Sequence, residues 1–297
     1  MRRIERAIDL PPSYRPGDAY AFHGRDAEGL AERIEGARIR KGVMVDGVPV
    51  ALDIDLGAQP GQALCTADAA GDGVLTGQRV DDILRNMLGL RIPPEPFETM
   101  AADDPLFAPV VARAPGMRVI QSATIFEAIT WAIIGQQINL AFAIALRRTF
   151  IALAGRAHPG GLWCYPEAGD VARLALDQLT SRKFSRAKAE TLLRLARLAD
   201  EGALDLARDA DLPTVSERLL AVKGIGPWTV NYALLRGYGF ADCSLEGDVA
   251  VRTAIGRLRG TEARPTMPEA AAFLAMYRPH RTMAAAHLWA SLSQPAA

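Results

Sequence analysis

A short glycine-containing segment in the last third of the chain has the residue types that bind an anion. Gly224 and Gly226 bracket Ile225, between a helix expected to end near Val222 and another expected to begin at Pro227. Glycine allows a left-handed backbone and a close approach by another molecule, and free N–H groups at the start of a helix attract an anion such as phosphate. The same G-x-G pattern also ends ordinary helices, so both interpretations stay open for this segment taken alone.

A carboxylate follows this segment at a position that fixes its direction. Asp248 comes after Gly247 and precedes an apolar helix pattern over residues 249–258, which predicts an N-cap aspartate. A cap needs no function to explain it. Backbone N–H groups at a cap nevertheless hold a carboxylate ionised and aimed, so a structural and a catalytic role are compatible. We expect the neighbouring Asp242 and Glu246 to be solvated turn residues.

Aromatic residues accompany both features. Trp228 and Tyr232 are four residues apart in the second helix and share one face of it. Trp289 lies on an expected helix near the C-terminus. Core packing alone explains such residues, and the residues themselves do not separate that interpretation from a pocket lined by rings. We expect Trp131 and Trp163 to be structural.

The longer pattern resembles a known family. The string V-x-G-I-G-x-W-T-x-N-Y from Val222 to Tyr232, followed by Gly247-Asp248, is similar to helix–hairpin–helix DNA glycosylases, in particular to the 3-methyladenine DNA glycosylase II branch. Further segments that look like the family are Phe126 to Gln137, Ser185 to Ala189 and, more loosely, Pro11 to Tyr14. The resemblance covers most of the chain. It implies an α+β fold: a mostly α-helical helix–hairpin–helix bundle with a small N-terminal antiparallel sheet.

The resemblance also implies roles for individual residues. The reactive aspartate of the family corresponds to Asp248, which would stabilise positive charge on the deoxyribose as the glycosidic bond breaks. The base pocket corresponds to Trp228, Tyr232 and Trp289, whose rings suit a cationic alkylated base. Contacts to DNA are implied for Lys223, Gly224, Ile225, Gly226, Thr229, Gln136 and Gln137. Independently of the resemblance, a second basic group is a candidate for DNA contact: Arg182, Lys183, Arg186 and Lys188. A basic helix face is usually just solvated, so both interpretations stay open.

The position of the intercalating side chain departs from the family. An apolar residue normally fills the gap that a flipped nucleotide leaves in the stack, whereas this chain has Gln137 there. Glutamine stacks less well than leucine, but its amide can hydrogen-bond the orphaned base. Gln136 and Gln137 are equally explained as two amides that cap a helix end, and both interpretations stay open.

The expected reaction is hydrolysis of the N-glycosidic bond of alkylated bases, such as N3- or N7-alkylated purines, in base excision repair. Lyases of the superfamily carry a lysine two residues after the second hairpin glycine, where this chain has Trp228, and an indole forms no imine. A DNA-binding module without chemistry and a bifunctional oxidised-base glycosylase and lyase are the alternatives. The chemistry implies no metal and no organic cofactor, and the cysteines Cys65, Cys164 and Cys243 are too far apart for a cluster motif.

The composition is that of an ordinary globular protein. The chain has 297 residues, with 34 basic and 34 acidic side chains. It has no apolar run near the ~20 residues of a membrane span, and no apolar stretch follows its charged start. We therefore expect a cytoplasmic, nucleoid-associated monomer with duplex DNA containing alkylated bases as its partner and no membrane contact. The scattered histidines are expected to be structural: His23, His158, His280 and His287.

Two domains are expected to position these residues. Residues 1–95 are predicted as an α+β domain with an antiparallel sheet, in which Asp46-Gly47 joins strands over 39–45 and 48–56. Helices are predicted over 27–34 and 77–88, and a proline-rich linker over 91–96. Residues 96–297 are predicted as an all-α helix–hairpin–helix glycosylase domain. Its helices are expected over 125–135, 138–154, 171–178, 186–200, 214–221, 228–236, 249–258, 268–276 and 282–291.

Overall fold

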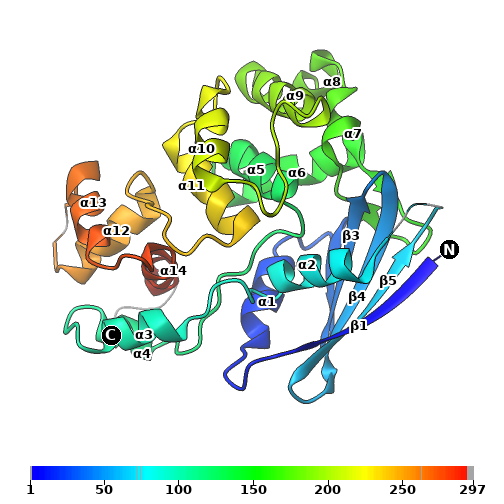
Figure 1. Cartoon of the computed structure of the whole chain (residues 1–297). Coiled ribbons are helices and arrows are strands. Elements are labelled where there is room, and N and C mark those ends of the chain that lie inside the picture. Colours follow the sequence, from blue (N-terminus) through cyan, green and yellow to red (C-terminus); the bar gives the residue numbers. More distant parts are fainter. Residues whose placement is uncertain (1, 72, 74, 262, 293–297) are drawn as a thin grey trace.

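The computed structural model of the chain describes residues 2–71, 73, 75–261 and 263–292. It is an α+β structure in which an N-terminal sheet lies at one side and helices make up the rest (Figure 1). This is the fold class expected from the sequence. No helix in the described part of the chain is both long and apolar enough to cross a bilayer.

The N-terminal sheet is antiparallel throughout and has the strand order β1-β5-β4-β3-β2. Its strands are β1 (Arg2–Asp9), β2 (Glu32–Glu35), β3 (Arg38–Val45), β4 (Val48–Gln59) and β5 (Gln62–Ala69). The hairpin at Asp46-Gly47 forms as expected, with both residues at positive φ. Alternate residues of β5 are buried, and these pack with the apolar face of α2 (Gly77–Met87) in one core.

The helix expected over residues 27–34 is wrong. Its last residues belong to β2, which pairs with β3 so that Glu32 lies opposite Lys41. Tertiary pairing in a sheet overrides a local helical pattern. The helix of this region lies earlier in the chain, as α1 (Pro16–His23).

The proline-rich linker is wrong in part. α3 (Glu95–Ala102) begins inside it, with Pro94 as its N-cap and Pro96 in its first turn. Proline lacks only an N–H that the first turn does not use, and its fixed φ suits a helix start. The short helix α4 (Ala108–Ala112) follows.

The rest of the chain is mostly helical. Its helices are α5 (Ile125–Gly135), α6 (Leu140–Ala154), α7 (Ala168–Ala172), α8 (Leu176–Thr180), α9 (Arg186–Asp200), α10 (Leu212–Ala221), α11 (Pro227–Ala233), the π-helical turn η1 (Leu234–Tyr238), α12 (Val249–Leu258), α13 (Met267–Ala275) and α14 (Arg281–Leu292). The single helix expected over 171–178 is wrong, because α7 and α8 share that region.

The expectation of an all-α second part is also wrong in one place. β6 (Arg156–Ala157) and β7 (Trp163–Cys164) pair with each other. Just beyond β7, Tyr165 forms a parallel bridge with Val43 of β3. The backbone of this segment thereby finds its partners in the N-terminal sheet, so the sheet and the helices are joined through the main chain. The division into residues 1–95 and 96–297 stays a prediction.

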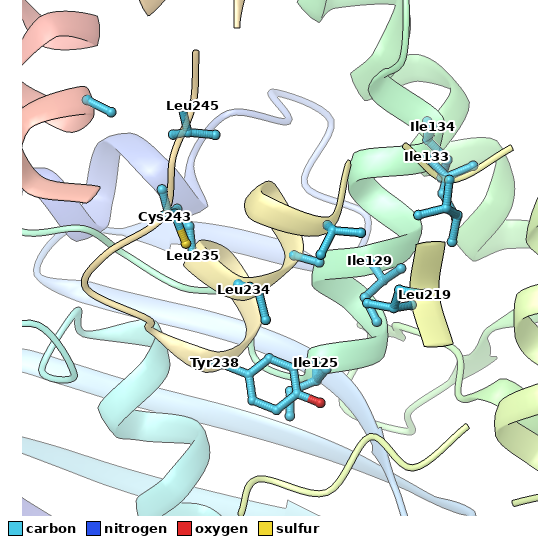
Figure 2. Packing of buried hydrophobic residues seen from close by; sticks show 14 of the residues in the cluster. Ile125, Ile129, Ile133, Ile134, Leu219, Leu234, Leu235, Tyr238, Cys243 and Leu245 are labelled. Atoms are coloured by element: carbon cyan, nitrogen blue, oxygen red, sulfur yellow. The ribbon is translucent and has the colours of Figure 1, made fainter. Parts of the chain in front are cut away.

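α5 lies at the centre of the helical part. Every residue from Ile125 to Ile134 is buried, because Ile125, Ile129 and Ile133 pack with residues of α10 and of η1 (Figure 2). Thr124 caps α5 by accepting a hydrogen bond from the Glu127 N–H. A helix fixed on all sides holds the residues along it and directly after it in defined positions.

A buried ionic network ties α5 and α6 to the sheet. Lys41 Nζ lies 2.8 Å from Glu32 Oε1 and 2.6 Å from Glu127 Oε1. Arg147 Nη2 lies 2.6 Å from Glu127 Oε1 and 3.0 Å from Glu32 Oε2. Burial raises the pKa of Glu32, but the charges of Arg147 and Lys41 hold that pKa well below its usual range. The four groups, which we call the buried ionic network, therefore balance each other's charge.

Candidate active site

The two-glycine segment forms a tight hairpin between α10 and α11. Gly224 has a φ of +101°, and a Cβ on it would lie 2.1 Å from Thr191 Oγ1. Only glycine fits this position. A Cβ on Gly226 would meet no heavy atom within 4 Å. A side chain on Gly224 would therefore collide with α9, whereas the space beside Gly226 is open to another molecule.

α9 holds the first hairpin peptide from the inside. Thr191 Oγ1 and Arg194 Nη1 donate hydrogen bonds to the Lys223 carbonyl, at 3.2 and 3.0 Å. In a trans peptide the N–H points opposite to the carbonyl of the same unit. The Gly224 N–H therefore points away from α9. Lys223 has an exposed side chain, so Lys223, Gly224 and Gly226 form the outward-facing part of the hairpin.

Three residues expected to contact DNA instead face the protein. Gln136 Nε2 donates to the Gly224 carbonyl at 3.0 Å and to Thr229 Oγ1 at 2.9 Å. Thr229 is 2% exposed and Ile225 is 6% exposed. The Ile225 N–H is also occupied, because it donates to the Val222 carbonyl. Gln136, Ile225 and Thr229 therefore support the hairpin from the protein side, and the contact with DNA expected for them stays a prediction.

Gln137 is arranged differently from its neighbour. Its side chain is exposed and its φ is +56°. A non-glycine residue in the left-handed region is uncommon and is retained mostly where function needs it. The first turn of α6 after it exposes Leu140 and Phe142. The turn between α5 and α6 therefore presents the Gln137 amide and, beside it, the apolar side chains of Leu140 and Phe142 to solvent.

The second basic group divides into different environments. Lys188 Nζ donates to the Ile134 carbonyl at the C-terminal end of α5, at 2.7 Å, and burial lowers the pKa of Lys188. Arg186 pairs with Glu190 on the surface of α9. Arg182 and Lys183 are exposed. Lys188 thus supports α5, and the other three stay candidates for DNA contact.

Asp248 is the N-cap of α12, as the sequence predicts, and its carboxylate is held by three donors. Oδ1 accepts hydrogen bonds from the Val251 N–H at 2.9 Å and from Trp289 Nε1 at 3.1 Å. Oδ2 accepts from Trp228 Nε1 at 2.9 Å. The residue is half-buried. A carboxylate with this many donors is fixed in one orientation, and it contacts two of the three rings predicted for the base pocket.

The loop before Asp248 is fixed at two points. Asn231 Oδ1 of α11 accepts from the Ser244 N–H at 3.0 Å. Arg281, at the start of α14, forms a bidentate ion pair with Asp242, at 2.7 and 2.8 Å. Asp242 is therefore an ion-pair residue and not a solvated turn residue. Glu246 accepts a hydrogen bond from the Ser244 hydroxyl, so both neighbouring carboxylates act inside the loop.

The aromatic side chains of the site form one cluster. Trp228 and Tyr232 have ring centroids 5.3 Å apart and planes inclined by 30°. The Tyr232 hydroxyl accepts from Trp131 Nε1 at 3.2 Å, which brings in a tryptophan from α5 that the sequence gives as structural. Trp289 joins through Asp248. With Phe22, described next, we call Trp131, Trp228, Tyr232 and Trp289 the aromatic cluster.

Three arginines also reach this cluster, and sequence reasoning missed all of them. One is Arg147 of the buried ionic network, whose Cζ lies 5.8 Å from the ring centre of Trp131. Arg236 Cζ lies 4.9, 5.9 and 5.8 Å from the ring centres of Phe22, Tyr232 and Trp289. Arg25 Cζ lies 3.8 Å from the ring centre of Phe22 and 5.2 Å from that of Trp131. Their separation along the chain gives no local signal. The site therefore has a carboxylate held by indoles and, on rings of the same cluster, three guanidinium groups, of which Arg147 is paired with glutamates of the buried ionic network.

Comparisons with known proteins identify the family. Residues 130–279 match the family model described as "HhH-GPD superfamily base excision DNA repair protein". The chain is 32% identical to a DNA-3-methyladenine glycosylase of Bacillus subtilis over 65% of this chain and 66% of that protein. It is 28% identical to DNA-3-methyladenine glycosylase 2 of Escherichia coli over 60% and 61%. The matched part thus spans less than two thirds of either relative's length.

A solved structure is similar over nearly the whole chain. The 3-methyladenine DNA-glycosylase from Archaeoglobus fulgidus aligns with a TM-score of 0.78, covers 97% of both chains and is 21% identical. At this identity the likeness establishes the fold. Because the family model covers the hairpin, the loop after it and half of the chain, the chain belongs to the HhH-GPD superfamily of base excision DNA repair proteins.

Proposed function

We propose that the protein is a monofunctional DNA glycosylase of base excision repair, which hydrolyses the N-glycosidic bond of alkylated bases in duplex DNA. The observation that carries the proposal is the Asp248 carboxylate, held by the indoles of Trp228 and Trp289. Relatives named as 3-methyladenine glycosylases support the choice of an alkylated base. We also propose that the enzyme acts as a monomer at the nucleoid.

The chemistry needs a fixed negative charge beside the sugar. As the C1′–N bond breaks, positive charge develops on the deoxyribose, and a preorganised carboxylate stabilises it. Three donors already orient Asp248 before substrate arrives, so little reorganisation is required. Water then adds to C1′ and its proton leaves to the carboxylate or to solvent. An alkylated cationic purine departs as a neutral base without a general acid.

The hairpin supplies the contact to the DNA backbone in this proposal. Lys223 carries an exposed positive charge, and the Gly224 N–H points outward. Gly226 leaves room for a phosphate to approach. Gln137 is proposed to fill the gap that the flipped nucleotide leaves, since its side chain is exposed in a left-handed turn.

Absence of lyase activity follows from the side chain at the lysine position. Trp228 occupies the place that bears the imine-forming lysine in bifunctional relatives, and its Nε1 is engaged with Asp248. An indole nitrogen is no nucleophile toward C1′. The proposed reaction therefore stops at an abasic site.

Released bases and the state of the DNA strand test the proposal together. The protein is incubated with methylated duplex DNA, free bases are identified by mass spectrometry, and strand integrity is examined before and after alkali. We expect free alkylated base and a strand that breaks only after alkali. A protein that binds the DNA but releases no base would be a non-catalytic module, and a borohydride-trapped covalent adduct would reveal a lyase. Either result contradicts the proposal.

A further inference from the structure

A cavity of about 520 Å³ lies at the N-terminal end of α5. Its wall is formed by α2, by the first residues of α5 and of α7, and by the segment from Ala199 to Arg208. The volume is within the range of about 300–1,000 Å³ that small-molecule sites have. The hairpin lies at the other end of α5, where Gln136 donates to the Gly224 carbonyl. Because the 11 residues of α5 span roughly 16 Å, the cavity is separate from the proposed DNA-binding surface.

Two arginines on the cavity wall have no ion-pair partner. Arg79 comes from α2, and Arg208 comes from the segment between α9 and α10. Within residues 2–71, 73, 75–261 and 263–292, no carboxylate oxygen lies within 4.0 Å of a side-chain nitrogen of either residue. Both guanidinium groups stay protonated at neutral pH. The cavity therefore presents two positive charges to a bound molecule.

Arg208 is fixed in place and still has free donors. Its Nη1 donates to the Gly237 carbonyl of η1 at 2.8 Å, and its Cζ lies 5.8 Å from the ring centre of Tyr238. Figure 2 shows that ring beside Ile125, which belongs to the cavity wall. A guanidinium group has five N–H donors, and Nε and Nη2 of Arg208 donate to no residue that the structure describes. These donors are available to an anion.

The charges around Arg208 favour a bound anion. Burial lowers the pKa of Arg208 to about 10. The positive charges of Arg91 and Arg79 act in the same direction. A neighbouring anion would offset this repulsion and replace the lost hydration with charge-assisted hydrogen bonds. The start of α5 adds to the effect, because it is the positive end of the helix dipole and lines the same cavity.

The acidic residues of the cavity have partners of their own. Asp82 forms an ion pair with Arg91 at 2.7 Å. The two Glu167 oxygens accept backbone N–H groups of the turn between β3 and β4, at 2.7 and 2.8 Å. Asp205 is exposed and accepts the Ala207 N–H at 2.8 Å. These carboxylates therefore leave Arg79 and Arg208 unpaired.

The rest of the cavity fits a flat organic ring. Its wall contains five large apolar residues: Ile83, Ile125, Phe126, Leu204 and Leu206. Guanidinium groups match the geometry of a phosphate, but a phosphate ion alone would leave the apolar wall uncovered. We propose that the cavity binds a nucleoside monophosphate, with the phosphate on Arg208 and Arg79 and the base against the apolar wall. This inference is independent of the proposed glycosylase function.

Binding measured without DNA tests the inference. Titration calorimetry gives the affinity of the whole protein for AMP, GMP, CMP and UMP, for the matching nucleosides and for ribose 5-phosphate. We expect at least one monophosphate to bind and to raise the melting temperature as its concentration rises. Its nucleoside, which lacks the phosphate, and ribose 5-phosphate, which lacks the base, should bind at least about tenfold more weakly.

Variants locate the bound nucleotide. Arg208→Gln is expected to weaken binding by about tenfold or more, because charge-assisted hydrogen bonds are lost. Arg79→Gln changes an exposed side chain, so the fold is kept, and affinity should fall about threefold. Arg85→Gln is the matched control, since Arg85 is an exposed arginine of the same helix that does not line the cavity. Lys223→Ala, at the hairpin, should bind the nucleotide as wild type does.

Several results would overturn the inference. Wild-type protein that binds none of the monophosphates contradicts it, and so does a nucleoside that binds as tightly as its monophosphate. Equal affinity for ribose 5-phosphate would contradict the binding of a base to the apolar wall. Loss of binding in Lys223→Ala, with normal binding in Arg208→Gln and Arg79→Gln, would place the nucleotide at the hairpin. None of these results bears on base release, so the proposed function is tested separately.

Discussion

The buried ionic network and the aromatic cluster both contain arginines beside aromatic rings. Only in the network does each of these charged groups contact an oppositely charged one. In the network, Lys41 and Arg147 each contact both Glu32 and Glu127. In the cluster, Asp248 takes its donors from neutral groups, while Arg25 and Arg236 have no acidic partner among the described residues. Ion pairs inside the protein stabilise the fold. Charged side chains without an oppositely charged partner in a half-buried aromatic site can instead act on a substrate.

Breaking the network should produce the largest loss of stability. Lys41 is fully buried, and Lys41→Met removes one of the two cationic side chains that contact both Glu32 and Glu127. We expect a loss of about 3–5 kcal/mol in the free energy of unfolding, measured by urea denaturation. Arg186→Gln removes an exposed ion pair with Glu190 and should change stability little. A Lys41→Met protein as stable as wild type would contradict the structural role of the network.

The buried His287 tests the same principle, because its protonation would place a charge without an opposite partner in the core. Burial lowers the pKa of His287 to about 4, and neither ring nitrogen has a hydrogen-bond partner among the residues that the structure describes. The unfolded chain binds this proton near pH 6.5, so the stabilisation is complete above pH 6.5 and falls as pH drops toward 4. The loss should reach about 3 kcal/mol.

The variant His287→Leu isolates this contribution. Its unfolding free energy should depend less on pH than that of wild type, and the difference between the two should grow in favour of the variant between pH 6.5 and 4. Parallel pH profiles for the two proteins would show that His287 does not titrate in this window.

The two hairpin glycines are expected to separate folding from binding. Gly224→Ala combines positive φ with a clash against Thr191 and should cost about 1–3 kcal/mol of stability. Gly226→Ala meets open space, so stability should be kept while affinity for duplex DNA falls. Thermal melting and equilibrium DNA binding measure the two effects. Loss of stability in Gly226→Ala, or normal DNA affinity there, would argue against an outward-facing Gly226.

The smallest effect is expected at Lys223. Its exposed charge should contribute one phosphate contact, so Lys223→Ala should weaken DNA binding a few-fold and reduce the slope of log K against log salt by about 0.9. Arg3→Gln changes an exposed charge on β1 that pairs with Glu5 and is the control. Identical salt slopes for Lys223→Ala and wild type would place the phosphate contact elsewhere.

The sequence predicted best what local chemistry determines. α5 begins after its capping Thr124 and spans the expected residues 125–135, and Asp248 caps α12 as expected. The pattern over residues 27–34 predicted a helix wrongly, because the pairing of β2 with β3 outweighs the local helical pattern. Glu32 illustrates the reason, since its ion-pair partners Lys41 and Arg147 come from other elements.

From the sequence, the site could be predicted only for the residues that the family resemblance covers. Trp228, Tyr232, Trp289 and Asp248 are brought together as the resemblance implies. Trp131 donates a hydrogen bond to a tyrosine 101 residues away, so no sequence spacing predicts that it belongs to the site. Phe22, Arg25 and Arg236 meet only in the folded chain. Thr229 and Ile225 lie in the motif, yet the direction of their side chains depends on packing that the motif does not encode.

The most direct test of the account replaces the Asp248 carboxylate with an amide of the same shape. Asp248→Asn is compared with Asp211→Asn, another N-cap aspartate, whose Oδ2 accepts from the Thr214 N–H. Single-turnover base release and DNA affinity are measured on the same samples. We predict that Asp248→Asn binds DNA as wild type does but releases base at least about 10³-fold more slowly, while Asp211→Asn releases base normally. Base release by Asp248→Asn within about tenfold of the wild-type rate would contradict a catalytic role for this carboxylate.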